Sequence, residues 1–341
     1  MATGREGDGS GRRRGGGGAG DSIQGSLNQV LQYAIANTST DSPSQPREQE
    51  EREALTAEKK EFMEKVFAEM LRDEVKEMKE HIDTLKGILK SETEEDQETK
   101  EERLELLLDL CESIDNAQDF LKLGGTDVAM SLCKDPSAEV RWRALDLLAT
   151  TVQNNPTNQG AMLDRGGLKM CLQVLDEDQS YQVRVKALYA VSCLVREHDA
   201  AQEALVEADG FSSLMRAMQS DVEKLQIKAA FLLSALLWEQ PKFNDTLHNM
   251  GMVQQLIHIL QGEHRMFHEH VMSAVLHLVS GHDGCCDDAL NPQLGFRTFL
   301  ENRVKELTGK EEFMEELDYS QKLLALFRKF APQDGATSAD R

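Results

Sequence analysis

The sequence is poor in aromatic residues and in proline. Aromatic side chains make up 5% of the 341 residues, and of the seven prolines only Pro136 lies between Ala54 and Asn154. Leu, Ala and Met are plentiful instead, and side chains that are not branched at Cβ lose little rotamer freedom in a helix. Since proline interrupts helices, its scarcity leaves long segments free to be helical. We therefore expect an all-α protein.

Long apolar runs and a secretory leader are also lacking. No segment is apolar over the length of a membrane span or of a signal peptide. The six cysteines lie mostly inside apolar helical patterns, which is typical of buried thiols in a reducing compartment and not of a disulfide framework. The formal net charge of −22 would repel a polyphosphate. We expect a cytosolic protein that binds neither nucleic acid nor membranes.

Motifs for catalysis and for cofactor binding are missing as well. The sequence has no phosphate-binding G-x-x-x-x-G-K-[ST] loop, no G-x-S-x-G nucleophile motif and no H-E-x-x-H zinc motif. These absences favour a protein that binds a partner over an enzyme. We expect no catalytic residue and no cofactor.

Five histidines lie close together, three of them in the segment EHRMFHEHV: His258, His264, His268, His270 and His282. Residues four apart share a helix face, so His264 and His268 could meet, whereas His268 and His270 point in different directions. No cysteine has zinc-site spacing to them, because Cys285 and Cys286 are adjacent and not two to four residues apart. We interpret the cluster as a polar turn and expect no bound metal.

Composition divides the chain into seven segments. The first, rich in glycine and arginine, is too polar to fold, and an uncharged apolar leader follows it. Residues 91–102 are mostly acidic and fit either a solvated linker or the frayed start of the next helix. The expected segments are a disordered tail at 1–21, the apolar leader at 22–40, a linker at 41–54, amphipathic helices at 55–90, an acidic linker at 91–102, an armadillo-like repeat domain at 103–331 and a disordered end at 332–341.

The repeat assignment rests on internal similarity of the sequence. Three units contain a long helical run, namely EVRWRALDLLATTVQ, QVRVKALYAVSCLVRE and LQIKAAFLLSALLWE. Shorter runs are opened by glycines that are 42, 43 and 41 residues apart: Gly125, Gly167, Gly210 and Gly251. We attribute these glycines to a tight left-handed turn, and we expect a fifth, divergent copy to start near His270. A period of this size with two or three helices per unit is typical of an armadillo-like helical repeat solenoid.

Positively charged residues recur at one position of the repeat. Arg143, Lys186 and Lys228 are 43 and 42 residues apart, and equivalent positions of a solenoid line up on one surface. In a chain with a net charge of −22, this cation ladder indicates a binding surface. The alternative is that each cation neutralises a neighbouring carboxylate, such as Asp146, Asp176 or Glu223.

A second surface candidate is Arg216, in the LMRAM run of a glycine-opened helix. It lies between two methionines, Met215 and Met218. We expect Met215 to be a core residue and Arg216 to face a partner.

Several of these blocks carry a resemblance to a known family. They resemble the heat-shock protein 70-binding protein family, which comprises armadillo-type nucleotide exchange factors of the heat-shock protein 70 chaperones. The resemblance is strong from residue 101 to about 280 and looser over 23–36 and 55–89. The blocks that carry it include CESIDNAQDF (111–120), VRWRA (140–144), VRVKAL (183–188), DGFSSLMRAMQ (209–219) and FHEHV (267–271).

The resemblance implies a function without catalytic residues. A member of this family binds the ATPase domain of heat-shock protein 70, favours a disrupted nucleotide cleft and speeds the release of ADP, and thereby of the client. Asn116, Ala117 and Lys228 lie in motifs that match the family's chaperone contact. The alternative is a plain armadillo scaffold that binds an extended peptide partner without exchange activity.

The apolar leader has two interpretations. Its helical stripe, which includes Leu27, Val30 and Leu31, predicts a helix docked on the solenoid. The resemblance implies instead that residues 22–37 imitate a client in the substrate-binding groove of the chaperone. The candidate side chains of this client-mimic segment are Leu27, Val30, Leu31, Tyr33 and Ile35.

Overall fold

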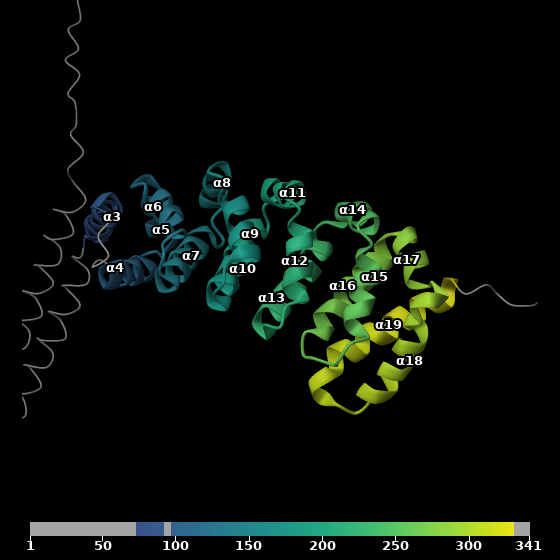
Figure 1. Cartoon of the computed structure of the whole chain (residues 1–341). Coiled ribbons are helices and arrows are strands. Elements are labelled where there is room, and N and C mark those ends of the chain that lie inside the picture. The colour runs from purple at the N-terminus through teal and green to yellow at the C-terminus, as the bar shows by residue number, and fades with distance from the viewer. Residues whose placement is uncertain (1–72, 92–96, 331–341) are drawn as a thin grey trace, which may run out of the picture. The chain divides into compact units, whose positions relative to one another are not determined.

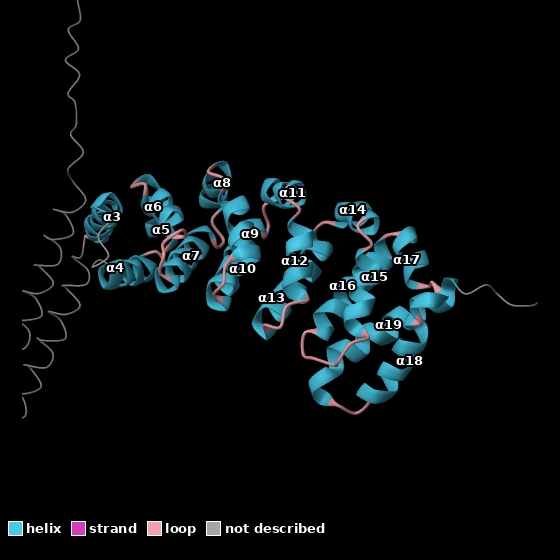
Figure 2. Cartoon of the chain, in the orientation of Figure 1, coloured by secondary structure: helices cyan, strands magenta, loops and turns pink. Residues whose placement is uncertain are grey.

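The computed structural model describes residues 73–91 and 97–330, which belong to the compact unit Asp73–Arg341. Every regular element of the described residues is a helix, and none is a strand (Figure 2). The predicted all-α solenoid is therefore confirmed for these residues. None of the described helices is long and apolar enough to span a membrane. Outside the described residues lie the tail, the apolar leader, the linker at 41–54, residues 55–72 of the predicted amphipathic helices, residues 92–96 of the acidic linker and the C-terminal end at 332–341.

The helices form five units of three helices, preceded by α3 and α4. In each unit a short first helix is followed by a second helix and then by a third. Single turns of 3-10 helix come before α14, α18 and α19. The helices are α3 (Glu74–Ser91), α4 (Gln97–Leu110), α5 (Ile114–Lys122), α6 (Gly125–Leu132), α7 (Ala138–Val152), α8 (Pro156–Asp164), α9 (Gly167–Glu177), α10 (Tyr181–Val195), α11 (Asp199–Glu207), α12 (Gly210–Met218), α13 (Glu223–Glu239), α14 (Asn244–Asn249), α15 (Met252–Leu260), α16 (His268–Gly281), α17 (Asp283–Ala289), α18 (Phe296–Leu307) and α19 (Met314–Phe330).

The third helices are the main packing elements of the solenoid. Each of α4, α7, α10, α13, α16 and α19 packs against the next one in this series. The first helices α8, α11 and α14 lie in a row along one edge of the same units (Figure 1). Side chains at the centre of the third helices, such as Leu148 and Leu233, are fully buried. Burial of these long apolar runs between units is the main source of stability.

The turn before each second helix contains a residue in the left-handed conformation. These residues are 42, 43, 42 and 44 apart along the chain: Gly124, Gly166, Asp209, Gly251 and Gly295. The glycines Gly125, Gly167 and Gly210 come one residue later and do not have a positive φ. The prediction that these glycines form the left-handed turn is therefore wrong for Gly125, Gly167 and Gly210. Gly251 does have a positive φ, so its equivalents are Gly124 and Gly166.

The repeated glycines after the turn have a steric reason. A Cβ on Gly167 would lie 2.5 Å from Met162 Cγ and 2.9 Å from the Met162 carbonyl oxygen. A Cβ on Gly210 would meet Leu205 in the same way, at 2.9 Å from its carbonyl oxygen. The second helix thus starts so close to the end of the first helix that only glycine fits.

Two predicted boundaries also differ from the structure. The fifth unit starts with α17 at Asp283, and not near His270, because α16 is the third helix of the fourth unit. The acidic linker predicted at 91–102 is shorter, because α4 already begins at Gln97. For residues 97–102 the second alternative, the start of the next helix, is therefore correct. Helix α3 packs on α4, α5 and α6 and so belongs to the same solenoid.

Polar side chains connect successive units. Asn158 on α8 donates hydrogen bonds to the carbonyl oxygens of Ala117 (2.8 Å) and Thr151 (2.9 Å) in the preceding unit. Arg141 on α7 forms a two-pronged ion pair with Asp178, at 2.7 and 3.0 Å. All six cysteines lie in the described part of the chain, where each is a buried free thiol.

Candidate functional site

The cation ladder lies on three adjacent third helices. Arg143 is on α7, Lys186 is on α10 and Lys228 is on α13. Two aromatic residues, Trp142 on α7 and Tyr189 on α10, lie between these cations. We call this set of five residues the third-helix face.

Cations and aromatic rings alternate across the third-helix face. The Arg143 guanidinium lies 4.3 Å from the centre of the Trp142 ring. Lys186 Nζ lies 5.7 Å from the same ring and 5.9 Å from the Tyr189 ring. Lys228 Nζ lies 5.4 Å from the centre of the same Tyr189 ring. Such cation–π contacts hold the ammonium groups in place without neutralising their charge.

Carboxylates neutralise two of the three cations. Arg143 forms ion pairs with Glu139 at 2.7 Å and with Glu105 at 2.9 Å. Lys186 Nζ lies 2.6 Å from Asp146 Oδ2. Arg143 and Lys186 therefore have the pairing with neighbouring acids that the alternative interpretation predicts.

Lys228 differs from its two equivalents. It is exposed, and among the described residues no carboxylate forms an ion pair with it. The position that holds Asp146 in the first unit, three residues after the cation, holds Phe231 after Lys228 and Tyr189 after Lys186. Since an aromatic ring attracts a cation without removing its charge, Lys228 keeps an ammonium group available for a partner.

A hollow of about 400 Å³ borders the third-helix face at Tyr189. Its lining includes Ile114 and Ala117 of α5, Gln153 and Tyr189. Burial raises the pKa of the Tyr189 phenol to about 12, so this group stays neutral, and its hydroxyl bonds Gln153 Oε1 at 3.2 Å. Ile114 is 55% exposed, which gives the hollow an apolar rim.

The structure places Asn116 and Ala117 differently from the cations. Asn116 is buried, and its amide donates hydrogen bonds to Glu74 Oε2 at 2.6 Å and to the Leu110 carbonyl oxygen at 2.9 Å. Ala117 is 2% exposed and lies at the floor of the hollow. Asn116 thus connects α3 to α5, and Ala117 lines the hollow.

Arg216 lies on a different layer of the solenoid. It is exposed on the second helix α12 and forms an ion pair with Asp176 of α9 at 2.7 Å. Met215 and Met218 are buried, as expected of core residues. Arg216 is therefore not part of the third-helix face. The five residues of the client-mimic segment, Leu27, Val30, Leu31, Tyr33 and Ile35, lie outside the described residues.

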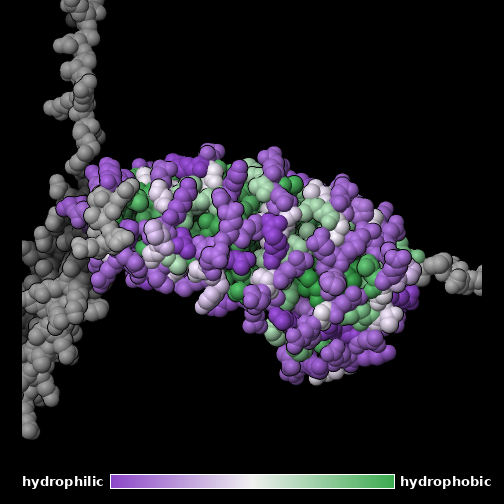
Figure 3. Space-filling view, viewed as in Figure 1, coloured by the Kyte–Doolittle hydropathy of each residue, from purple (hydrophilic) through white to green (hydrophobic). Residues whose placement is uncertain are grey.

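The two aromatic residues of the face were missed by the sequence analysis. Their signal is weak, because Trp142 stands directly before a ladder cation and Tyr189 three residues after one. A spacing of three places side chains on one helix face, and this rule could have identified Tyr189 and Phe231. The surface in Figure 3 is mainly hydrophilic, with hydrophobic residues in small patches.

Two family models match the chain. Residues 116–258 match the SIL1/FES1/HPBP1 C-terminal domain, a range that contains the whole third-helix face. Residues 27–120 match the nucleotide exchange factor Fes1 model, a range that contains the apolar leader from Leu27 onward.

Relatives that align with most of this chain show the family to which it belongs. Hsp70-binding protein 1 of Mus musculus is 41% identical over 306 residues, which cover 87% of this chain and 84% of the relative. The human protein of the same name matches equally well, with 41% identity over the same coverage. The chain belongs to the Hsp70-binding protein 1 family.

Relatives with lower identity occur in fungi. The Hsp70 nucleotide exchange factor FES1 of Debaryomyces hansenii is 27% identical over 78% of this chain and 84% of its own length. Among solved structures, the designed armadillo repeat protein YIII(Dq)4CqI superposes with a TM-score of 0.60 at 18% identity, over 73% of this chain and 99% of its own. The latter similarity confirms the armadillo-like fold.

Proposed function

We propose that this chain is a nucleotide exchange factor of the heat-shock protein 70 chaperones. It binds the ATPase domain of the chaperone, promotes the release of ADP and thereby the release of the client. The relatives named Hsp70-binding protein 1 and Hsp70 nucleotide exchange factor support this assignment. The proposed place of action is the cytosol.

The observation that carries the proposed contact is Lys228. Within the ladder it alone lacks a carboxylate partner among the described residues, and it is exposed beside an aromatic ring. An acidic lobe of the ATPase domain offers the complementary charge. The proposed contact includes Lys186 and Arg143 on the two preceding third helices and Ala117 in the hollow beside Tyr189. Asn116 and Arg216 remain proposed contact residues outside the third-helix face.

The proposed mechanism requires only a difference in affinity. A protein that binds the open conformation of the nucleotide cleft more tightly than the ADP-bound conformation shifts the population toward the open one. By linkage, ADP must then weaken the complex by the same factor. No group of this chain has to touch the nucleotide, so the proposal needs no catalytic residue and no cofactor.

The direct test follows a fluorescent ADP as it leaves the chaperone in a stopped-flow experiment. We expect this chain to increase the rate constant of release in a saturable manner. A plain armadillo scaffold would bind the chaperone or a peptide without changing this rate. An unchanged release rate at saturating concentration would therefore reject the exchange function and leave the scaffold.

We propose a second role for residues 22–37. NQVLQYAIAN is apolar and free of charged residues, which is the chemistry of a client segment. Tethered to the bound solenoid, such a segment would compete for the substrate-binding groove at a high effective concentration. This role belongs to the same complex and does not change how ADP release is promoted.

A further inference from the structure

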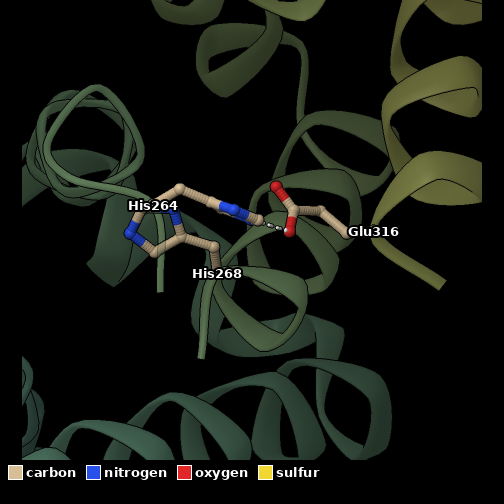
Figure 4. A group of neighbouring side chains, drawn as sticks. All are labelled: His264, His268 and Glu316. Atoms are coloured by element: carbon tan, nitrogen blue, oxygen red, sulfur yellow. Dashed lines mark hydrogen bonds and ion pairs between the residues drawn. The ribbon is translucent and has the colours of Figure 1, made fainter. Parts of the chain in front are cut away.

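A cluster of metal-binding side chains lies where the fourth and fifth units meet. His264 precedes α16, His268 is the first residue of α16, and Glu316 is on α19 (Figure 4). One ligand atom from each side chain lies within 4.8 Å of the others. His264 and Glu316 are 52 residues apart in the sequence, so only the fold brings them together.

The geometry of the cluster is close to that of a metal site. His264 Nε2 lies 2.7 Å from Glu316 Oε2, and the two imidazole rings are 5.5 Å apart between their centres. Two atoms that bind one tetrahedral zinc ion at about 2.0–2.1 Å are roughly 3.3 Å apart. Small side-chain rotations would therefore bring the three ligand atoms to the distances that zinc requires.

Two polar atoms of the cluster are buried without a hydrogen bond. His268 and Glu316 are each 1% exposed, and His268 Nδ1 and Glu316 Oε1 have no hydrogen-bond partner. Buried polar atoms in native proteins nearly always have a partner, and an unpaired one calls for an explanation. A cation bound between the three side chains would supply the missing interaction of His268 Nδ1, whereas Glu316 Oε1 lies 3.7 Å from Arg303 Nε.

Two arginines act against a cation at this place, namely Arg265, the residue after His264, and Arg303. Arg303 Nε lies 3.7 Å from Glu316 Oε1, whereas the other oxygen, Oε2, faces His264. The guanidinium therefore contacts the oxygen that the histidines do not use. In this position it orients the carboxylate, as outer residues of metal sites do.

A hollow of about 550 Å³ borders the cluster at His264. Its lining also includes Phe313, Arg265 and three acidic side chains. These acids are Asp221, Glu223 and Glu263. Carboxylates at the entrance favour the approach of a cation.

We propose that His264, His268 and Glu316 bind one zinc ion, with water as the fourth ligand. Two imidazoles and a carboxylate are a ligand set that zinc prefers, and Mg²⁺ and Ca²⁺ prefer oxygen ligands only. The ion would fasten α19 of the fifth unit to the start of α16. Its role would be to stabilise this end of the solenoid, independently of the proposed chaperone contact.

The test uses the full chain after treatment with a chelator. We expect dialysis against zinc to load one ion per chain and to raise the midpoint of thermal unfolding, because the site exists only in the folded state. We expect magnesium to do neither. Cobalt(II) should give the visible absorption bands of a four-coordinate site. A chain that retains no zinc, or whose unfolding midpoint zinc leaves unchanged, would overturn the proposal.

Three variants assign the binding to this cluster. We expect His264→Gln to lose the ion and the thermal shift, and His258→Gln, which changes an exposed histidine of α15, to keep both. His264→Cys replaces one zinc ligand by another and should restore binding, which a variant with merely disturbed packing would not do. Equal zinc binding by His264→Gln and the parent chain, or no binding by His264→Cys, would contradict the assignment.

Discussion

Equivalent residues of a repeat differ in what they can bind. Arg143, Lys186 and Lys228 occupy one position of three successive units, yet their charges are not equally available. Arg143 has several carboxylates around it and Lys186 has Asp146. Of the three, only Lys228 has an aromatic ring, that of Tyr189, and no ion-paired carboxylate among the described residues. A partner that recognises positive charge on the third-helix face would therefore depend mostly on Lys228.

Reversal of the charge at Lys228 tests this point. We expect Lys228→Glu to weaken binding to the chaperone ATPase domain more than tenfold, or by more than about 1.4 kcal/mol, with unchanged helicity. Lys169→Glu makes the same change at an exposed residue of α9, outside the face, and should bind normally. Titration calorimetry measures both. Unchanged affinity of Lys228→Glu would give the ladder a purely structural role.

Buried amides act at the same scale, between units. The side chain of Asn158 donates to Ala117 and Thr151 of the preceding unit. Each hydrogen bond adds about 0.5–1.5 kcal/mol, so we expect Asn158→Ala to lower the free energy of unfolding by about 1–3 kcal/mol. Urea unfolding followed by circular dichroism gives this value.

A surface amide serves as the control for Asn158. Gln173 is exposed and bonds only Glu177 of its own helix in the described contacts. We expect Gln173→Ala to change the free energy of unfolding by no more than about 0.5 kcal/mol. If both variants lost the same stability, the bonds between units would have no special weight.

At the scale of elements, the turn into each second helix combines two constraints. One residue needs a positive φ, and the next needs to lack a Cβ. Gly166 meets the first constraint with a φ of 75°, and Gly167 meets the second. Asp209 shows that a short polar residue can replace glycine at the first position, whereas the second position depends on the neighbouring helix.

Two alanine substitutions should have opposite effects. Gly167→Ala puts a Cβ against Met162, and overpacking of this kind costs about 1–3 kcal/mol. Gly87→Ala, in the interior of α3 with no atom within 4 Å of the new Cβ, should stabilise the chain by about 0.5–1 kcal/mol. Thermal and urea unfolding of both variants check the signs. A stabilised Gly167→Ala would show that the contact relaxes without cost.

The sequence predicted what is local and periodic, and it failed where contacts are long-range. Helical periodicity and the spacing of cations were sufficient for the solenoid and for the positions of Arg143, Lys186 and Lys228. The pairing of Lys186 with Asp146 crosses from α10 to α7, so periodicity along one helix could not decide it. Glu316 is 52 residues from His264, and no spacing rule connects them. Gly251 was misplaced by one position because glycine serves both constraints of the turn.

At the scale of the whole molecule, the two sites lie in different parts of the solenoid. The third-helix face belongs to the first three units, and the proposed zinc site joins the fourth to the fifth. The proposed zinc ligands can therefore be substituted without changing a residue of the third-helix face. The chain has a net charge of −22, and Lys228 is an exposed positive charge on it. Charges of both signs can therefore contribute to the selection of a partner.

The apolar leader extends this selection beyond the solenoid. If residues 22–37 imitate a client, their deletion should leave ADP release nearly unchanged, because the solenoid engages the ATPase domain without them. Client release should slow, because nothing then competes for the substrate-binding groove. Leu31 and Ile35 would each contribute about 1.5–3 kcal/mol by burial, less the cost of ordering the segment.

A double substitution separates the mimic from a docked helix. We expect Leu31→Asp with Ile35→Asp to slow the release of a labelled client peptide as the deletion does, because an acidic side chain does not fit an apolar groove. The thermal unfolding midpoint of the isolated protein should stay unchanged. A helix docked on the solenoid would give the reverse result, since charge at its apolar stripe would lower that midpoint. Lost stability together with normal client release would therefore exclude the mimic and identify the leader as part of the fold.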